Sequence, residues 1–398
     1  MKIFKRAVFI AAALTMTIGA GSISAETVKI GLITSTSGQG TFLGEQMVQA
    51  AKLYMTQNKS RLPSGVDVDL VVRDDGGPNP DKARQLAQEL IVREKVDFLT
   101  GFIWSPNGAA VAPLSTEAKV PTLLMNAGAS ANITLSPYFV RFSFGTSTAP
   151  YYLGKWAGQR YKTSYIAVTD YGPGFDSEKY FELGFKQNAD SKIVGRVRMP
   201  INTADFVPYL QKVKELKPDV LFVFVPTGRI GVNFVKAFND LGLAKEGIKL
   251  VGTGDITADE ELQSLGDAAL GLLTVHHYSG AGDRQATKDF NASWAAAYGK
   301  DSIPSFAAPQ AWDTMDAIYE AIIAQKGKVT ADKSMEILRN YKSDHSPRGT
   351  ISIDPRTRDI RQNEYLREVR KVDGKLANIE IEVVGEQVLD PWVEQNSK

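Results

Sequence analysis

Three closely spaced glycines follow the first apolar segment and form a turn that could serve a ligand. The segment is 28–33, and Gly38, Gly40 and Gly44 come after it, just before a helix-like stretch. A glycine-rich turn between a strand and a helix often holds nucleotide phosphates. The spacing here is GxGxxxG rather than GxGxxG, and 34–37 (Thr-Ser-Thr-Ser) separate the first glycine from the strand. The turn is therefore a poor match for a dinucleotide-binding loop.

Four loops share a composition that suits a small ligand. They are rich in glycine or small polar residues, and they span 36–42, 102–107, 126–130 and 226–229. Small residues leave backbone N–H groups accessible to an anion. In α/β folds a ligand lies at the carboxyl ends of strands, near helix N-termini. These loops are the predicted ligand contacts.

Metal and catalytic chemistry have weaker support. His276–His277 is the strongest metal candidate, but adjacent residues of a strand point to opposite faces, and His345 is the only other histidine. Asp74–Asp75 and Asp81 lack the spacing of an EF-hand loop. The chain has no G-x-S-x-G turn. We therefore expect no bound metal, no cofactor and no enzymatic activity.

The elements that carry these loops alternate between strand and helix. A strand is predicted at 66–73, and Asn79–Pro80 then supplies an N-cap and a proline for the first turn of a helix. A further strand is predicted from 95 to 99. The same order recurs with a strand at 194–199 and a helix capped by Thr203 or Asp205.

The strand predicted at 220–225 has the most informative composition. Its six residues are all apolar, which is typical of a parallel strand buried on both faces. The repeated helix–strand order then predicts two α/β lobes, consistent with a chain of this length.

The first 25 residues read as a secretory signal. Lys2, Lys5 and Arg6 precede an apolar stretch from 7 to 20, and Ala25 provides a small residue at the cleavage edge. The sequence contains no cysteine, so a lipid anchor of the bacterial lipoprotein type is excluded. We expect the protein to be free in the periplasm. Without 1–25 the chain has 43 basic and 45 acidic residues, so no basic excess indicates nucleic-acid binding.

Several segments together carry a family resemblance. These are IGLITSTSGQGTFLGEQMVQAAKLYM, VRDDGGPNPDKARQLAQELI, VDFLTGFIWSPNGAAVAPLSTEAKVPTLLMNAGAS, YIAVTDYGPGFDSEKYFELGFK and GDAALGLLTV. In order and spacing they resemble the periplasmic substrate-binding proteins of the branched-chain amino-acid transport family, in its hydrophobic amino-acid uptake branch. The resemblance implies a type I periplasmic binding fold, which is two Rossmann-like lobes joined by three crossover strands. It also implies closure of the lobes on a ligand.

This fold implies a division of the chain between the lobes. We expect residues 26–145 and 277–350 in the first lobe, and residues 146–276 and 351–398 in the second.

The resemblance also implies a site for a ligand carboxylate. Ser105 matches the family's serine directly. The loop Ala127–Ser130, with Gly128, matches in length, but the usual threonine falls at Ala129. Either the Ser130 hydroxyl or backbone N–H groups would then complete the contact.

Amino-acid binders of the family hold the ligand ammonium with an acidic residue that aligns with Gly254. Asp255 is one position away. A shift of one residue normally turns a side chain away, although a small backbone shift would turn Asp255 inward. The α-ammonium group therefore lacks an assured partner.

Aromatic residues and one arginine complete the candidate site. We expect ligand contacts from Trp104, Phe175, Tyr151 and Arg229, and from Ser37 and Phe42 in the first loop. Trp104 would otherwise be core packing, and Arg229 a solvated residue at a helix start. A ring cluster with one guanidinium suits an aromatic carboxylate. Amino acids and amides are the alternative ligands.

Two partners are compatible with such a protein. One is an inner-membrane ABC permease, to which the protein, expected to be a monomer, delivers its ligand. The other is a receptor that the protein serves as a sensor module. A transporter gene cluster beside the gene would favour the permease.

Overall fold

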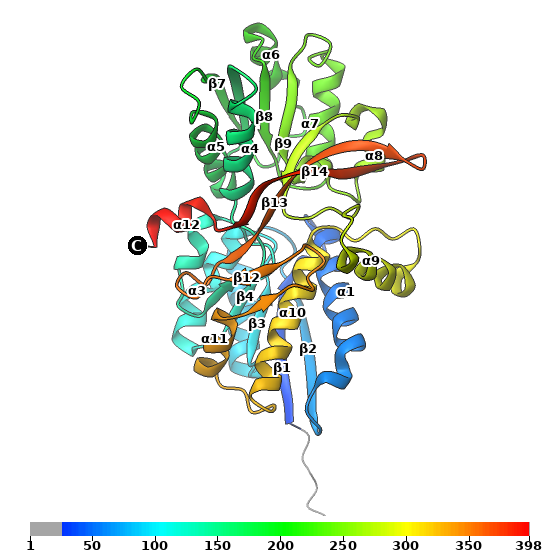
Figure 1. Ribbon diagram of the computed structural model, residues 1–398. Helices are drawn as coiled ribbons and strands as arrows, with labels where there is room; N and C mark the ends of the chain where they lie inside the picture. The colour runs from blue at the N-terminus through cyan, green and yellow to red at the C-terminus, as the bar shows by residue number, and fades with distance from the viewer. Residues whose placement is uncertain (1–25, 398) are drawn as a thin grey trace, which may run out of the picture.

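Two α/β lobes, one above the other, make up the chain (Figure 1). The computed structural model describes residues 26–397, so the predicted signal peptide at 1–25 lies outside the described residues. We call the lobe that contains β1 (Glu26–Thr34) the lower lobe. The lobe that contains β8 (Val220–Phe224) is the upper lobe.

The lower lobe is built on a parallel sheet of five strands in the order β2-β1-β3-β4-β5. Ile30 and Leu32 of β1 lie in one core cluster, whereas Ile33 lies in another. Successive side chains of a strand point to opposite faces, so β1 has to be covered on both. The remaining strands are β2 (Val66–Asp74), β3 (Phe98–Gly101), β4 (Thr122–Leu124) and β5 (Phe139–Arg141).

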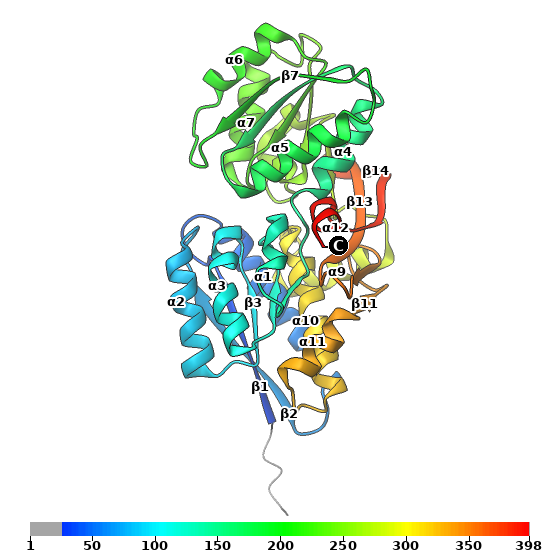
Figure 2. The same cartoon turned by 90° about the vertical axis from the view of Figure 1, so that its left-hand side faces the viewer.

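Helices cover both faces of the lower sheet (Figure 2). One face packs against α1 (Thr41–Asn58), α9 (Gln285–Tyr298), α10 (Ala307–Ala324) and α11 (Ala331–Arg339). The other face packs against α2 (Pro80–Glu89) and α3 (Ser105–Ala118).

The upper lobe repeats this plan. Its strands β6 to β10 are parallel, and β13 continues the sheet in the antiparallel direction. All five residues of β8 are buried, as its apolar composition predicts. The strands are β6 (Thr163–Thr169), β7 (Lys192–Met199), β9 (Lys249–Thr253), β10 (Leu273–His276), β13 (Ile360–Val372) and β14 (Lys375–Val388), with β11 (Lys342–Ser343) and β12 (Ile351–Ile353) at the lower end.

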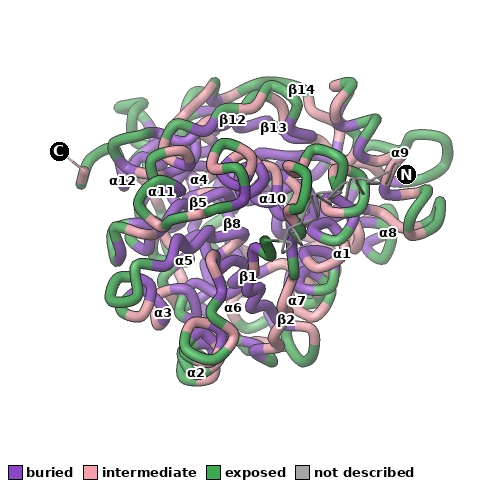
Figure 3. The backbone as a smooth tube through the Cα atoms, turned by 90° about the horizontal axis from the view of Figure 1, so that it is seen from below, coloured by how far each residue is buried: buried purple, intermediate pink, exposed green. Residues whose placement is uncertain are grey.

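Two helical layers enclose the upper sheet. Residues of α4 (Thr148–Gly158) and α5 (Gly172–Phe185) lie in one core cluster. Residues of α6 (Val207–Leu216), α7 (Arg229–Asp240) and α8 (Leu262–Leu265) lie in the other. Figure 3 shows the result from below, with β1 and β8 buried and the outer surface of α2 exposed. Short helical turns occupy Lys59–Arg61, Leu90–Glu94, Ser130–Thr134, Gly254–Thr257 and Gly266–Ala269.

One of the two predicted helix caps is confirmed. The Asn79 side chain accepts a hydrogen bond from the Lys82 backbone N–H at 3.1 Å. At the start of α6 the N-cap residue is Phe206, which makes no side-chain cap hydrogen bond, so the cap predicted at Thr203 or Asp205 is wrong. Asp205, one residue before the N-cap, accepts from the N–H of Val207 at 2.9 Å. The strand predicted from 95 begins only at 98, since Lys95 is left-handed (φ 55°) and ends the preceding helical turn.

The C-terminal part does not follow the predicted division. Ile351, Ile353 and Ile360 belong to a core cluster of the lower lobe, although 351–398 was expected in the upper lobe. After β14 the chain returns to the lower lobe, where Val393 of α12 (Pro391–Asn396) is buried in its second cluster. The physical reason is that β13 and β14 pass between the lobes and bring α12 back to the junction (Figure 1).

Among residues 26–397, no helix combines the length and the apolar composition needed to cross a bilayer.

Candidate functional site

A pocket between the lobes is lined by residues of both. Its volume is about 50 Å³, well below the roughly 300–1,000 Å³ of typical ligand pockets, so a dinucleotide does not fit, in line with the poor phosphate-loop match. The lining residues are Gly40, Leu43, Ile103, Trp104, Ser105, Asn126, Gly128, Phe144, Thr146, Tyr171, Pro173, Phe224, Pro226, Thr227, Asp255 and Phe306.

A larger open groove of about 910 Å³ lies on the lower lobe, beside α1 and α10. Its central carboxylate, Asp316, already accepts hydrogen bonds from Tyr54, Arg61 and Tyr341. Because these groups satisfy one another, the pocket between the lobes is the better candidate site.

Helix starts surround the pocket. Ser105 is the first residue of α3, Tyr171 directly precedes α5, and Thr227 lies two residues before α7. The first N–H groups of a helix have no acceptor within the helix, and its N-terminus carries partial positive charge. The pocket therefore favours a ligand with an anionic group at one end.

Aromatic rings form much of the pocket wall. Tyr171 and Phe224 of the upper lobe are nearly parallel, with ring centroids 6.2 Å apart. Phe306 meets Phe144 edge-on at 6.2 Å. Trp104 adds a fifth ring and is 6% exposed. Such a wall offers both stacking and edge contacts to a flat ligand.

Hydrogen bonds hold Trp104 in place. Its indole N–H donates to the Ser35 hydroxyl at 3.1 Å, and Ser35 donates to Asp75 at 2.6 Å. Asn107 donates to the other oxygen of Asp75 at 2.8 Å. Phe102 has φ 65°, a conformation that non-glycine residues seldom adopt, and it turns the chain from β3 into the pocket loop. The loop is therefore rigidly positioned, and Trp104 is both core and pocket wall.

Asp255 points into the pocket. β9 ends at Thr253, and the helical turn Gly254–Thr257 changes the chain direction, so the alternation expected of a strand does not apply. The hydroxyls of Thr227 and Thr253 donate to its two oxygens at 2.8 and 2.7 Å. Burial raises the pKa of Asp255, while these two hydrogen bonds favour its ionised form. Of the two orientations considered for Asp255, the structure has the inward one, in agreement with its choice as a candidate contact.

Gly254 does not line the pocket. A Cβ at this position would overlap the ring of His276 and the guanidinium of Arg367. The absence of a side chain is thus explained by close packing at β10 and β13. The position that aligns with the family's acidic residue therefore has no room for a side chain here.

The loop 127–130, predicted to bind a ligand carboxylate, makes most of its polar contacts with other parts of the protein. The Ser130 hydroxyl donates to Asp390 at 2.7 Å, and its backbone N–H donates to Asp176 at 2.9 Å. Ala127 is fully buried in the lower core. Of this predicted loop, Gly128 lines the pocket, whereas Ala127 and Ser130 support it.

Five other predicted contacts lie outside the pocket lining. Ser37 is exposed and hydrogen-bonded to Asp74. Phe42 and Phe175 are 43% and 41% exposed. Tyr151 accepts a hydrogen bond from Gln187 on the outer side of α4. Arg229 is the exposed first residue of α7.

The histidine pair does not separate onto two faces as predicted. The rings of His276 and His277 lie 4.2 Å apart, because β10 ends at His276. Burial lowers the pKa of both well below the usual histidine value, so both are neutral. Within residues 26–397, no group of three or more His, Cys, Asp or Glu residues is arranged to hold a metal ion.

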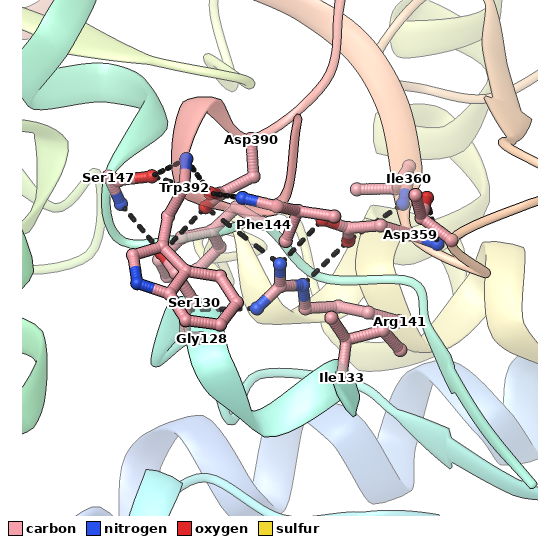
Figure 4. A network of polar contacts seen from close by, with 12 residues as sticks. Gly128, Ser130, Ile133, Arg141, Phe144, Ser147, Asp359, Ile360, Asp390 and Trp392 are labelled. Atoms are coloured by element: carbon pink, nitrogen blue, oxygen red, sulfur yellow. Dashed lines mark hydrogen bonds and ion pairs between the residues drawn. The ribbon is translucent and has the colours of Figure 1, made fainter. Parts of the chain in front are cut away.

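A buried ion network supports the pocket wall (Figure 4). Arg141 donates to both oxygens of Asp359, at 2.7 and 2.6 Å, and to the carbonyl of Gly128 at 3.2 Å. Asp390 lies 3.8 Å from the same guanidinium and accepts from Ser147 at 2.6 Å. The network therefore joins the pocket loop to the residues that directly precede α4, β13 and α12.

The sequence interpretation missed most of the ring wall. Tyr171 is four residues before Phe175, and the helix start at Gly172 places Tyr171 at the strand end and Phe175 one turn away. A usable signal existed for Tyr171, Phe224 and Thr227, because each lies at or just after the carboxyl end of a strand. The same signal marks Phe144, which lies three residues after β5, whereas none marks Phe306. The pocket also contains Thr146, which was not selected, and Asn126 and Thr227, which lie in the predicted ligand loops 126–130 and 226–229.

Comparison with known proteins decides the family. A family model described as "Periplasmic binding protein" matches residues 27–375. The chain belongs to this family. The resemblance inferred from the ligand loops and the two-lobed α/β fold are thereby confirmed.

Individual relatives of this periplasmic binding protein cover nearly its full length. "Leu/Ile/Val-binding protein homolog 6" of Brucella melitensis is 37% identical over 372 residues, 93% of this chain and 95% of the relative. A solute-binding protein of an ABC transporter from Rhodopseudomonas palustris BisB5, solved with 3,4-dihydroxybenzoic acid, is 40% identical with a TM-score of 0.87, covering 92% and 99% of the two chains. A second, from strain HaA2 and solved with p-hydroxybenzoic acid, is 39% identical with a TM-score of 0.88, covering 93% and 100%.

Proposed function

We propose that this protein is the solute-binding component of an ABC uptake transporter and that it binds a small aromatic carboxylate between its lobes. The observation that carries the proposal is the pocket wall of five rings, contributed by Trp104, Phe144, Tyr171, Phe224 and Phe306. Two solved relatives at 39–40% identity hold hydroxylated benzoic acids, which supports the same ligand class for this chain.

The proposed carboxylate contact is at the start of α3. The Ser105 hydroxyl accepts a hydrogen bond from the Ala129 N–H at 3.0 Å, which leaves its own hydrogen free to donate to a ligand. The dipole of α3 adds to this attraction. The ring would then lie against Trp104, whose indole is already fixed by Ser35.

A ligand screen tests the proposal. Calorimetry with benzoate, 4-hydroxybenzoate, cinnamate, leucine and phenylalanine is expected to give at least one aromatic acid a Kd of about 1 μM or tighter, corresponding to roughly −8 kcal/mol. Leucine should bind at least about tenfold more weakly, since its side chain cannot stack. Micromolar binding of leucine without binding of any aromatic acid would contradict the proposal.

Branched-chain amino acids are the second candidate ligands. The observation in their favour is the carboxylate of Asp255 in the pocket, which would provide a counter-charge for an ammonium group. The names of the Brucella relatives point the same way. We rank this candidate second because aliphatic side chains make no specific use of the ring wall.

We also propose that binding closes the lobes and that the closed form is delivered to an inner-membrane permease. Lining residues from both lobes support closure, since one ligand would bridge them. The export predicted for 1–25 and the family support a periplasmic location. A transporter gene cluster beside the gene would favour delivery over a sensor role.

Closure has a measurable consequence. Small-angle scattering at a saturating concentration of the bound acid is expected to give a smaller radius of gyration than the ligand-free protein. Scattering with a non-binding acid serves as the control. An unchanged radius at saturation would show that binding and closure are not coupled.

A further inference from the structure

Asp255 retains hydrogen-bonding capacity that the protein does not use. An ionised carboxylate offers about four acceptor positions, and Asp255 receives one side-chain hydrogen bond on each oxygen, from Thr227 and from Thr253. The side chain is 9% exposed, and it lines the pocket. A ligand in the pocket would therefore meet a carboxylate that has acceptor capacity left.

A second residue of the pocket wall, on the lower lobe, has an unused acceptor. The Asn126 amide nitrogen donates to the carbonyl of Ile103 at 2.9 Å, which sets the orientation of the amide. Its oxygen is buried and has no hydrogen-bond donor among residues 26–397. Buried acceptors are normally satisfied, so a ligand donor would complete this group.

These acceptors are not matched by a protein cation. Within the described part of the chain, no ion pair joins Asp255 to a basic side chain. The nearest guanidinium that lowers its pKa, that of Arg367, donates instead to the Tyr278 carbonyl at 2.7 Å and to Thr274 at 3.1 Å. The pocket thus combines donors at the start of α3 with acceptors at Asp255 and Asn126.

We propose that Asp255 selects aromatic acids that carry a ring hydroxyl, by accepting a hydrogen bond from that hydroxyl. Asn126 provides the acceptor for a second hydroxyl. This inference rests on the proposed binding of an aromatic carboxylate. The carboxylate lies toward Ser105 and the hydroxyl toward Asp255, so that like charges are kept apart. With plain benzoate, Asp255 keeps its two threonine donors but gains none from the ligand.

The test compares ligands that differ only in the donor. Calorimetry on the wild-type protein is expected to show 3- or 4-hydroxybenzoate binding about 10- to 100-fold more tightly than benzoate, the usual range for a hydrogen bond to a charged group. The methoxy analogue of the preferred acid keeps the oxygen but lacks the hydrogen. It should bind no more tightly than benzoate, and this arm requires no variant.

Asp255→Asn then identifies the residue. The preference for the hydroxylated acid should fall by about tenfold, through weaker hydroxybenzoate binding, while benzoate binds equally or more tightly because a negative charge is gone. Asp219→Asn is the matched control. That carboxylate also accepts from a threonine, Thr163 at 2.9 Å, but it is exposed and does not line the pocket.

The outcomes separate the two proposals. Equal affinities for benzoate and hydroxybenzoates would overturn the role of Asp255 and leave aromatic-acid binding standing. An unchanged preference in Asp255→Asn would overturn the residue assignment. Binding of leucine alone, weakened in Asp255→Asn, would overturn both and assign Asp255 to an ammonium group.

Discussion

Replacing Arg141 with leucine is expected to lower the free energy of unfolding by about 3–5 kcal/mol, the usual loss when one partner of a buried ion pair is removed. Arg141 and Asp359 are fully buried, and Asp390 is 1% exposed. The variant would leave two carboxylates buried without their cation. Urea unfolding followed by tryptophan fluorescence measures the loss.

Arg370→Leu is the matched control for this experiment. Arg370 also pairs with a carboxylate, that of Glu368, but its side chain is 52% exposed. Exposed pairs contribute about 0–1 kcal/mol, so this variant should unfold near the wild-type midpoint. A loss below about 1 kcal/mol for Arg141→Leu would mean that water reaches the network after the substitution. Because Arg141 also binds the Gly128 carbonyl, weaker ligand binding is expected as well.

Trp104→Ala is the second change with a large expected effect. It removes a side chain that is 6% exposed and lies in the main core cluster of the lower lobe. Truncation of a buried tryptophan costs about 3–5 kcal/mol of stability. Because Trp104 also lines the pocket, affinity for the bound acid should fall at least about 30-fold, equivalent to roughly 2 kcal/mol. Unfolding and calorimetry measure the two effects on one protein.

Trp294→Ala separates packing from ligand contact. Trp294 belongs to the same core cluster, and its indole N–H also donates to a serine, Ser302 at 2.9 Å. It does not line the pocket. It should therefore lose similar stability and keep its affinity at temperatures where it remains folded. If both variants lose affinity equally, Trp104 acts through packing alone, which was the alternative left open by the sequence.

The sequence by itself determined the family, the two α/β lobes and the loops that carry the pocket. These properties are local. An unbroken apolar run such as 220–225 requires cover on both faces, and the cap at Asn79 needs only its own three neighbours. The loops were predictable because ligands of parallel α/β sheets lie at strand ends.

Only the tertiary structure decided which side chains line the pocket. The Ser130 hydroxyl is hydrogen-bonded to Asp390, 260 residues further along the chain. Gly254 is packed closely against His276 and Arg367. Asp255 enters the pocket because the chain leaves the strand one residue earlier, at Gly254. The direction of a side chain changes from each residue to the next, both in a strand and in a helix. A shift of one residue in the end of an element, or a partner far away in the sequence, therefore changes which side chains line the pocket. Neither can be predicted from a local sequence pattern.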